Sequence, residues 1–159
     1  MRVVTAILLA TLCSLCARAN ADVPTEVILR TNGPIAVEVG RRGSASLTLV
    51  PAPGKSLFHA APITVNVKVA PQDQAPADGI RLLRERFSSK DAADPRADAL
   101  RFELLFDAVR TGRYQLVIRA RFWVCGQHTC RPVDDTASLA VTVSEKVPPP
   151  YPGAPPGAR

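Results

Sequence analysis

The stretch that organises the rest of the sequence is Arg121-Phe122-Trp123-Val124-Cys125-Gly126-Gln127-His128-Thr129-Cys130-Arg131-Pro132. A run of strand-like residues from Tyr114 to Val124 leads into the two cysteines, and a second run from Ala137 to Val143 follows them. Four residues, one of them glycine, separate the cysteines, which is a normal length for a hairpin connection. Cysteines at the two ends of such a connection can face each other across the strands, close enough for a disulfide.

The first 21 residues have the features of a cleaved export signal. Arg2 supplies the charged start, an apolar run extends from Val3 to Leu15, and Ala19-Asn20-Ala21 is a small-x-small cleavage site. This apolar run is too short to span a membrane. We therefore expect a mature chain that begins at Asp22 and is periplasmic or secreted.

The predicted signal changes the cysteine count. Cys13 and Cys16 fall inside it, which leaves Cys125 and Cys130 in the mature chain. Two neighbouring cysteines in an exported protein favour one disulfide, because the compartment is oxidising.

The charge pattern argues against nucleic acid and membrane as partners. Removal of Arg2 and Arg18 with the signal lowers the formal net charge from +6 to +4. The remaining basic residues are spread along the chain without a basic block, which is typical of a solvated surface rather than of a nucleic-acid site. No later apolar run reaches membrane-spanning length, so we expect no membrane insertion of the mature chain.

Apolar residues alternate with polar ones in short runs, a pattern typical of half-buried strands. The expected strands cover residues 27–29, 35–39, 44–50, 63–69, 100–106, 114–124 and 137–143. Residues 80–87 fit either a helical turn or a short strand, and residues 88–98 are expected to form an exposed loop. Short strands separated by turns rich in Pro and Gly predict an all-β, two-sheet sandwich over residues 22–146.

The last residues, 147–159, are rich in proline. Such a segment cannot pair into a sheet, so we expect an extended, disordered tail. A docking motif for a partner is the alternative interpretation of this tail.

Three uses of the cysteine pair remain open on the residues alone. A structural disulfide would pin the hairpin and contribute about 2 kcal/mol, because the ring is short. A redox-active pair would be reached by a partner thiolate, with His128 and Arg131 favouring a thiolate electrostatically. A metal site would use both cysteines and His128, but no fourth ligand is identified, and we predict no metal and no cofactor.

Trp123 lies on the same predicted strand face as Cys125. On that face it either shields the disulfide or packs on the edge of the sheet. It is therefore a candidate shielding residue of the cysteine pair.

Residues 112–143 resemble the N-terminal periplasmic domain of the thiol:disulfide interchange protein DsbD, and more closely the stand-alone DsbD-like domains of exported bacterial proteins. The similar elements are a Gly-containing turn, aromatic-x-Val-Cys, a short loop, Cys-x-Pro and a final alternating strand. Upstream, the segment from Pro53 to His59, followed by Pro62 and a strand, and the step Ala77-Asp78-Gly79-Ile80 are also similar to the family. The resemblance extends roughly from Leu47 to Val143.

This resemblance implies an immunoglobulin-like sandwich in which Cys125 and Cys130 exchange electrons with partner proteins. The implied partners are periplasmic thiol or disulfide proteins and a separate membrane electron carrier. It also implies an aromatic cap over the disulfide, for which Phe87 is the candidate. The sequence departs from the family in spacing its cysteines by four residues instead of five, and in Glu85-Arg86 where two acids are expected.

The function that we predict is exported thiol–disulfide exchange through Cys125 and Cys130. The alternative is a non-catalytic interaction module in which the same disulfide is purely structural. The two differ in whether the sulfurs are accessible and in the reduction potential of the pair.

Overall fold

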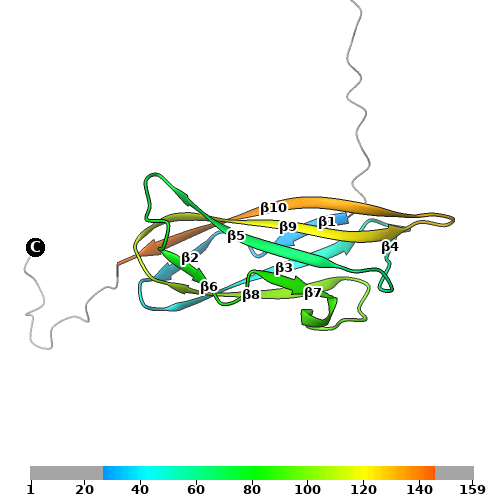
Figure 1. Cartoon of the computed structure of the whole chain (residues 1–159), viewed down its shortest axis with the longest axis horizontal. Coiled ribbons are helices and arrows are strands. Elements are labelled where there is room, and N and C mark those ends of the chain that lie inside the picture. The colour runs from blue at the N-terminus through cyan, green and yellow to red at the C-terminus, as the bar shows by residue number, and fades with distance from the viewer. Residues whose placement is uncertain (1–26, 146–159) are drawn as a thin grey trace, which may run out of the picture.

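The computed structural model describes residues 27–145, which form two β-sheets packed face to face (Figure 1). The predicted all-β sandwich is therefore confirmed. The predicted export signal, 1–21, and the predicted Pro-rich tail, 147–159, lie outside the described residues, as do residues 22–26 and 146.

The four-stranded sheet has the order β1–β3–β8–β6, and its neighbouring strands are all antiparallel. Its strands are β1 (Val27–Thr31), β3 (Arg42–Pro51), β8 (Leu100–Ala108) and β6 (Ile80–Leu82). The sequence alternation matches the burial here, because every second residue of β8 is buried while Arg101 and Glu103 are exposed. One face of this sheet therefore covers the core and the other faces solvent.

The six-stranded sheet has the order β2–β10–β9–β5–β7, and a short additional strand, β4, pairs with the end of β9. Its strands are β2 (Ile35–Glu38), β4 (Ser56–Leu57), β5 (Thr64–Gln72), β7 (Arg86–Ser88), β9 (Gly112–Cys125) and β10 (Cys130–Ser144). The pairing of β2 with β10 is parallel, and the other pairings are antiparallel.

The strand order is immunoglobulin-like. The order β1–β3–β8–β6 corresponds to the A, B, E and D strands of that fold, and β5, β9 and β10 correspond to C, F and G. Tyr114 at the start of β9 supports this assignment, because its hydroxyl lies 3.1 Å from the carbonyl oxygens of Arg110 and Thr111. Such a bond from a strand-F tyrosine back to the upstream corner is a hallmark of immunoglobulin-like sandwiches.

The core consists of the inward-facing residues of both sheets. Its largest fully buried side chains are Tyr114, Phe102, Phe106, Phe122, Leu47, Leu49, Ile63, Leu100, Leu104, Leu116, Ile118 and Val65. No charged or polar side chain is buried among residues 27–145. Burial of apolar area at about 25 cal/mol per Å² is thus the main term that holds the sheets together.

The structure decides the alternative left open for residues 80–87 and corrects several of the expected boundaries. Residues 80–87 contribute two short strands, β6 and the start of β7, rather than a helical turn. The expected loop 88–98 contains a 3₁₀ turn, η1 (Ser89–Asp91), and the buried Ala92. The last strand begins at Cys130 rather than at Ala137, and β4 was not expected.

The hairpin of β9 and β10 is the longest feature of the domain (Figure 1). Its register extends from the Gly112–Val143 pair to the Cys125–Cys130 pair without interruption. The inner part of β9 is anchored by β5, whereas its last residues reach beyond β5 and pair with β4. The fold therefore places the two cysteines at one end of the sandwich.

Candidate functional site

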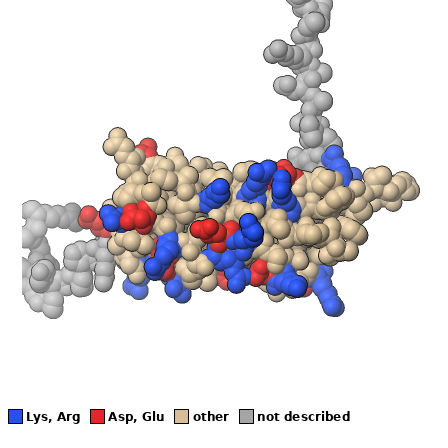
Figure 2. Space-filling model, in the orientation of Figure 1, with Lys and Arg blue, Asp and Glu red and all other residues tan. Residues whose placement is uncertain are grey.

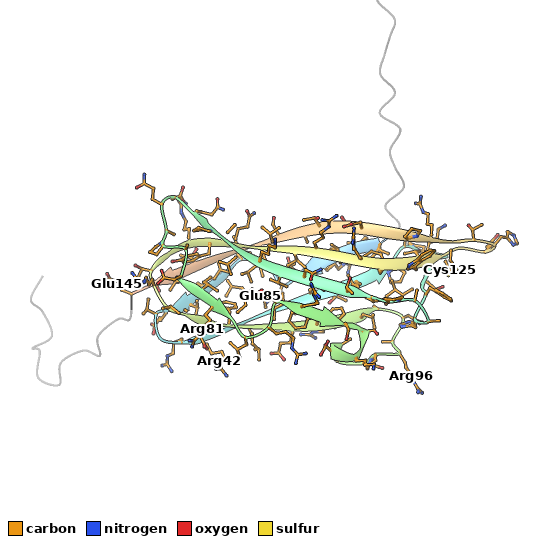
Figure 3. All side chains as sticks on the ribbon, viewed as in Figure 1. Arg42, Arg81, Glu85, Arg96, Cys125 and Glu145 are labelled. Atoms are coloured by element: carbon orange, nitrogen blue, oxygen red, sulfur yellow. A yellow bond between two sulfur atoms is a disulfide. The ribbon has the colours of Figure 1, made fainter. Side chains whose placement is uncertain are left out.

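Cys125 and Cys130 form a disulfide at the end of the long hairpin, as predicted. They are directly opposite each other in the register, with their Cα atoms 3.9 Å apart. The four-residue connection is closed by a hydrogen bond from the Gly126 amide to the Thr129 carbonyl, at 2.8 Å. Figure 3 shows Cys125 at the end of the domain opposite to Glu145.

The two cysteines differ in exposure. Cys130 is exposed, whereas Cys125 is half-buried. Phe122 and Val124 of β9 are buried, so the alternation of the strand puts Trp123 and Cys125 on the outer face of the six-stranded sheet. The disulfide therefore faces solvent rather than the core.

The short strand β4 brings a second segment to the disulfide. Ser56 pairs with Cys125, and Leu57, which is buried, pairs with Val124. The next amide, that of Phe58, donates a hydrogen bond to the Trp123 carbonyl at 2.9 Å, so Phe58 continues the same register. This contact was not predicted, because the pairing of two residues with a strand more than sixty positions away leaves no pattern in the sequence.

An exposed apolar row lies next to the disulfide on this face. We define the apolar row as Phe58, Trp123 and Pro132, which occupy neighbouring positions directly after β4, on β9 and on β10. Phe58 is 41 % exposed and Trp123 is 37 % exposed, and the informative feature is that these two rings lie side by side as a patch. Trp123 thus flanks the disulfide on the same sheet face, as the sequence predicted, and remains open to solvent.

A charged row lies beyond the apolar row. Asp134 accepts two hydrogen bonds of 2.7 Å from Arg119 and one of 2.8 Å from Arg121. These guanidiniums hold the pKa of the Asp134 carboxyl well below its usual range. Between the two rows is a groove of about 350 Å³, lined by Pro62, Arg121, Phe122, Trp123, Pro132, Val133 and Asp134.

The residues Lys55, His128 and Arg131 lie near the hairpin tip, and Lys55 was not among those predicted. The Lys55 side chain lies over Gly126, since a Cβ atom built on that glycine would be 3.0 Å from the lysine Nζ. His128 is exposed in the connection. Arg131 pairs with the buried Val124, so the strand alternation directs it to the ribbon face opposite the disulfide. Lys55 is therefore the basic residue that the sequence reasoning missed.

The structure does not bring Phe87 to the disulfide. Its ring is 5 % exposed and packs edge-on against Phe102, with the ring centroids 6.2 Å apart. In the register Phe87 pairs with Val65, which in turn pairs with Ala120 rather than with Cys125. The position of this ring is explained by the core, and the exposed rings near the sulfurs are Phe58 and Trp123.

Charged side chains are distributed unevenly on the surface. On the face shown in Figure 2, Lys, Arg, Asp and Glu gather over the middle of the sheets, while the hairpin end is mostly uncharged. Within residues 27–145 no group of three or more His, Cys, Asp and Glu side chains is arranged to hold a metal ion. The chemistry that the described site offers is that of the disulfide itself.

No helix of the described part is long and apolar enough to cross a membrane. A disulfide on an exposed hairpin is stable in an oxidising compartment and is reduced in the cytosol. The disulfide thus indicates an extracytoplasmic location.

The fold and the site define an immunoglobulin-like β-sandwich domain with a cross-strand disulfide at the end of its C-terminal hairpin. No family model matches the sequence, and no curated protein matches it. The DsbD-like resemblance stays a prediction.

Solved structures similar to this chain include several β-sandwich proteins. The major subunit AggA of aggregative adherence fimbriae from Escherichia coli aligns with 10 % identity and a TM-score of 0.41, over 74 % of this chain and 94 % of AggA. A PapD-like domain of human CEP192 aligns with 12 % identity and a TM-score of 0.43, over 92 % of this chain and 100 % of that domain. The E. coli chaperone DraB aligns with 11 % identity and a TM-score of 0.40, over 72 % and 54 %. Similarities this distant carry no functional argument.

Proposed function

We propose that this protein is an exported thiol–disulfide exchange domain that passes electrons through Cys125 and Cys130 to or from periplasmic partner proteins. The observation that carries the proposal is the position of the disulfide. One sulfur-bearing residue, Cys130, is exposed on an open sheet face, next to an apolar row that a protein partner can cover. A disulfide that only pins a fold has no need for either feature.

The exchange step follows from the different exposure of the two cysteines. A partner thiolate attacks Sγ of Cys130, a new intermolecular S–S bond forms, and the Cys125–Cys130 bond breaks with Cys125 leaving as a thiolate. A second partner thiolate then attacks the partner sulfur of the mixed disulfide and releases the Cys130 thiolate. Two partner thiols are thereby oxidised to one disulfide, and the domain gains two electrons and, on protonation, two thiols.

The surroundings of the leaving sulfur support this direction of attack. Cys125 is paired with Ser56 on one side, and the Lys55 ammonium lies over the adjacent Gly126. A nearby cation lowers the pKa of a thiol and makes its thiolate a better leaving group. Arg131 adds a positive charge at the same end of the hairpin from the opposite ribbon face, and His128 lies in the exposed connection between the two cysteines.

The proposal includes export and a separate electron partner. Cleavage after Ala21 would release a mature domain of residues 22–146 with its Pro-rich tail, and a membrane electron carrier or a thioredoxin-like protein would supply or accept the electrons. The mass of the protein recovered from the periplasm tests the cleavage. A mass that retains residues 1–21 would refute it.

The second candidate function is a non-catalytic interaction module with a structural disulfide. It is favoured by the register of the hairpin, in which the disulfide joins the last pair of a long antiparallel ladder. In that case the bridge prevents fraying of the two strand ends, and the exposed apolar row alone binds a partner.

The reduction potential of the Cys125–Cys130 pair separates the two functions. The purified domain is equilibrated in graded glutathione or dithiothreitol buffers, and the thiols are trapped and counted by mass. We expect a value between roughly −120 and −270 mV, the range of exchange proteins. A value below about −300 mV, with the fold unchanged on forced reduction, would refute exchange and leave the structural module.

A further inference from the structure

The outer sheet face carries three successive rows of side chains next to one another. The disulfide row contains Ser56, Cys125 and Cys130, and the apolar row lies two residues further along each strand. The charged row, with Arg121 opposite Asp134, lies two residues beyond that. Side chains two residues apart on a strand share a face and are about 6.6 Å apart, so the rows have this spacing.

An extended peptide has the same spacing. Its residues i and i+2 project to one side and are also about 6.6 Å apart. When its cysteine reaches the disulfide row, the residue two positions away is over the apolar row, and the intervening residue points away from the domain. An apolar residue at that second position would cover Phe58 and Trp123, whose exposed rings otherwise face water.

We propose that the site recognises partner proteins through an extended segment in which an apolar residue lies two positions from the reactive cysteine. This inference rests on the proposed exchange function and specifies its substrate class. The continuity of the apolar row with the disulfide carries it, because Trp123 and Pro132 lie two residues from Cys125 and Cys130 on the same strands and also line the groove beyond them.

The pairing of the strands favours docking across the sheet face over addition of a strand at its edge. At Cys125 the backbone of β9 is already paired on both sides, by β10 and by β4. Two edges remain near the sulfurs: that of β4, which is only two residues long, and that of β10, where Pro132 lacks an amide donor and Asp134 and Asp135 are charged. Proline and charge are the usual means by which sheet edges resist an added strand.

The test measures the rate at which short peptide thiols reduce the oxidised, full mature chain. The peptide acetyl-Cys-Gly-Leu-Gly-amide and its reverse order, acetyl-Gly-Leu-Gly-Cys-amide, place leucine two positions from the cysteine. Two controls are acetyl-Cys-Gly-Gly-Gly-amide, without leucine, and acetyl-Cys-Leu-Gly-Gly-amide, with leucine at the position that points away. Second-order rate constants are compared after correction for the measured thiolate fraction of each peptide.

We expect at least one of the two test peptides to react about tenfold faster than both controls. This factor corresponds to about 1.4 kcal/mol, a reasonable gain for partial burial of a leucine side chain. Trp123→Ala and Phe58→Ala should each reduce severalfold the ratio of the test-peptide rate to the glycine-control rate, with both rates measured in the same variant. Leu83→Ala is the matched control variant, because Leu83 is 45 % exposed and bonds by its amide to Leu105 of the other sheet, so the advantage should persist.

Three outcomes overturn the inference while leaving exchange intact: equal rates for all peptides, equal acceleration by leucine at the adjacent position, or an advantage that survives both aromatic substitutions. The second outcome would indicate general apolar attraction of the peptide. The third would indicate that the peptide binds away from the apolar row, for example as an added strand at the β10 edge. Failure of the proposed function looks different, because a structural disulfide would resist every peptide thiol, including the glycine control.

Discussion

Reduction of the Cys125–Cys130 disulfide should leave the domain folded and should cost little stability. The bridge closes a ring of only six residues, from 125 to 130. The chain-entropy relation gives about 2 kcal/mol for a ring of this size at 25 °C. Domains typically have 5–15 kcal/mol of stability, so most of it should remain after reduction.

The position of the disulfide also indicates that its reduction costs little stability. The nearest buried residue of β9 is Val124, and the largest buried side chains of the strand, Phe122 and Tyr114, lie further from the tip. The sandwich is held by apolar contacts that do not involve the sulfurs. Fraying of the last strand pair should therefore expose little apolar area.

The same free energy appears in the reduction potential by thermodynamic linkage. A disulfide that stabilises the fold by about 2 kcal/mol is itself stabilised by the fold to the same extent. For a two-electron couple this lowers the potential of the folded domain by about 40 mV relative to the urea-unfolded chain. Both quantities are measured independently, so they check each other.

The assay combines urea unfolding of the oxidised, reduced and Cys125→Ser/Cys130→Ser forms with redox titration in and out of urea. Far-UV circular dichroism follows the sheets, and fluorescence of Trp123, the one tryptophan of the chain, follows the hairpin end. A loss above about 5 kcal/mol, or a potential difference above about 100 mV, would refute the reasoning, because the disulfide would then be a main support of the fold.

Two further predictions concern charge and packing. Asp134→Asn should lower the urea midpoint at pH 7, because the ion pairs with Arg119 and Arg121 depress the pKa of that carboxyl in the folded state. This stabilisation is present above the unfolded-state pKa of about 4 and is lost as the pH falls through the lower folded-state pKa. The difference in urea midpoint between the wild type and the variant should therefore shrink only in acid. A difference that stays constant from pH 7 to pH 2 would contradict the prediction. Gly79→Ala should destabilise by about 3 kcal/mol, because the added Cβ would lie 1.7 Å from the hydroxyl of the buried Tyr114. Gly126→Ala is its control, since that Cβ meets only the flexible end of Lys55; equal midpoints for the two variants in urea unfolding would show that Tyr114 can move.

The sequence was sufficient for the features that depend on local periodicity. The alternation of apolar and polar residues in β8 and β9 identified the buried faces correctly, because each sheet has one solvent-exposed face and one buried face. The hairpin and its disulfide followed from the spacing of Cys125 and Cys130 in one turn. These signals lie within a few residues of each other, where the chain geometry leaves few choices.

The parts of the site that escaped prediction depend on distant pairing. Phe58 and Lys55 reach the disulfide because β4 pairs with the end of β9, and two paired residues leave no periodic pattern. Phe87 has the aromatic character expected of a cap, but its inward orientation is decided by its pairing with Val65. Arg131 is close to Cys130 in sequence, yet alternation turns it to the other face.

The fold separates the part of the hairpin that is held in the core from the part that carries the disulfide. Tyr114, Leu116, Ile118 and Phe122 anchor β9 in the core, and its pairing with β5 ends at Arg121. Beyond that residue β9 pairs with β4 and β10, and its sulfur faces away from the buried Phe122 and Val124, so the proposed exchange needs no rearrangement of buried side chains. Repeated opening and closing of the disulfide, which the proposed exchange requires, would therefore leave the core in place.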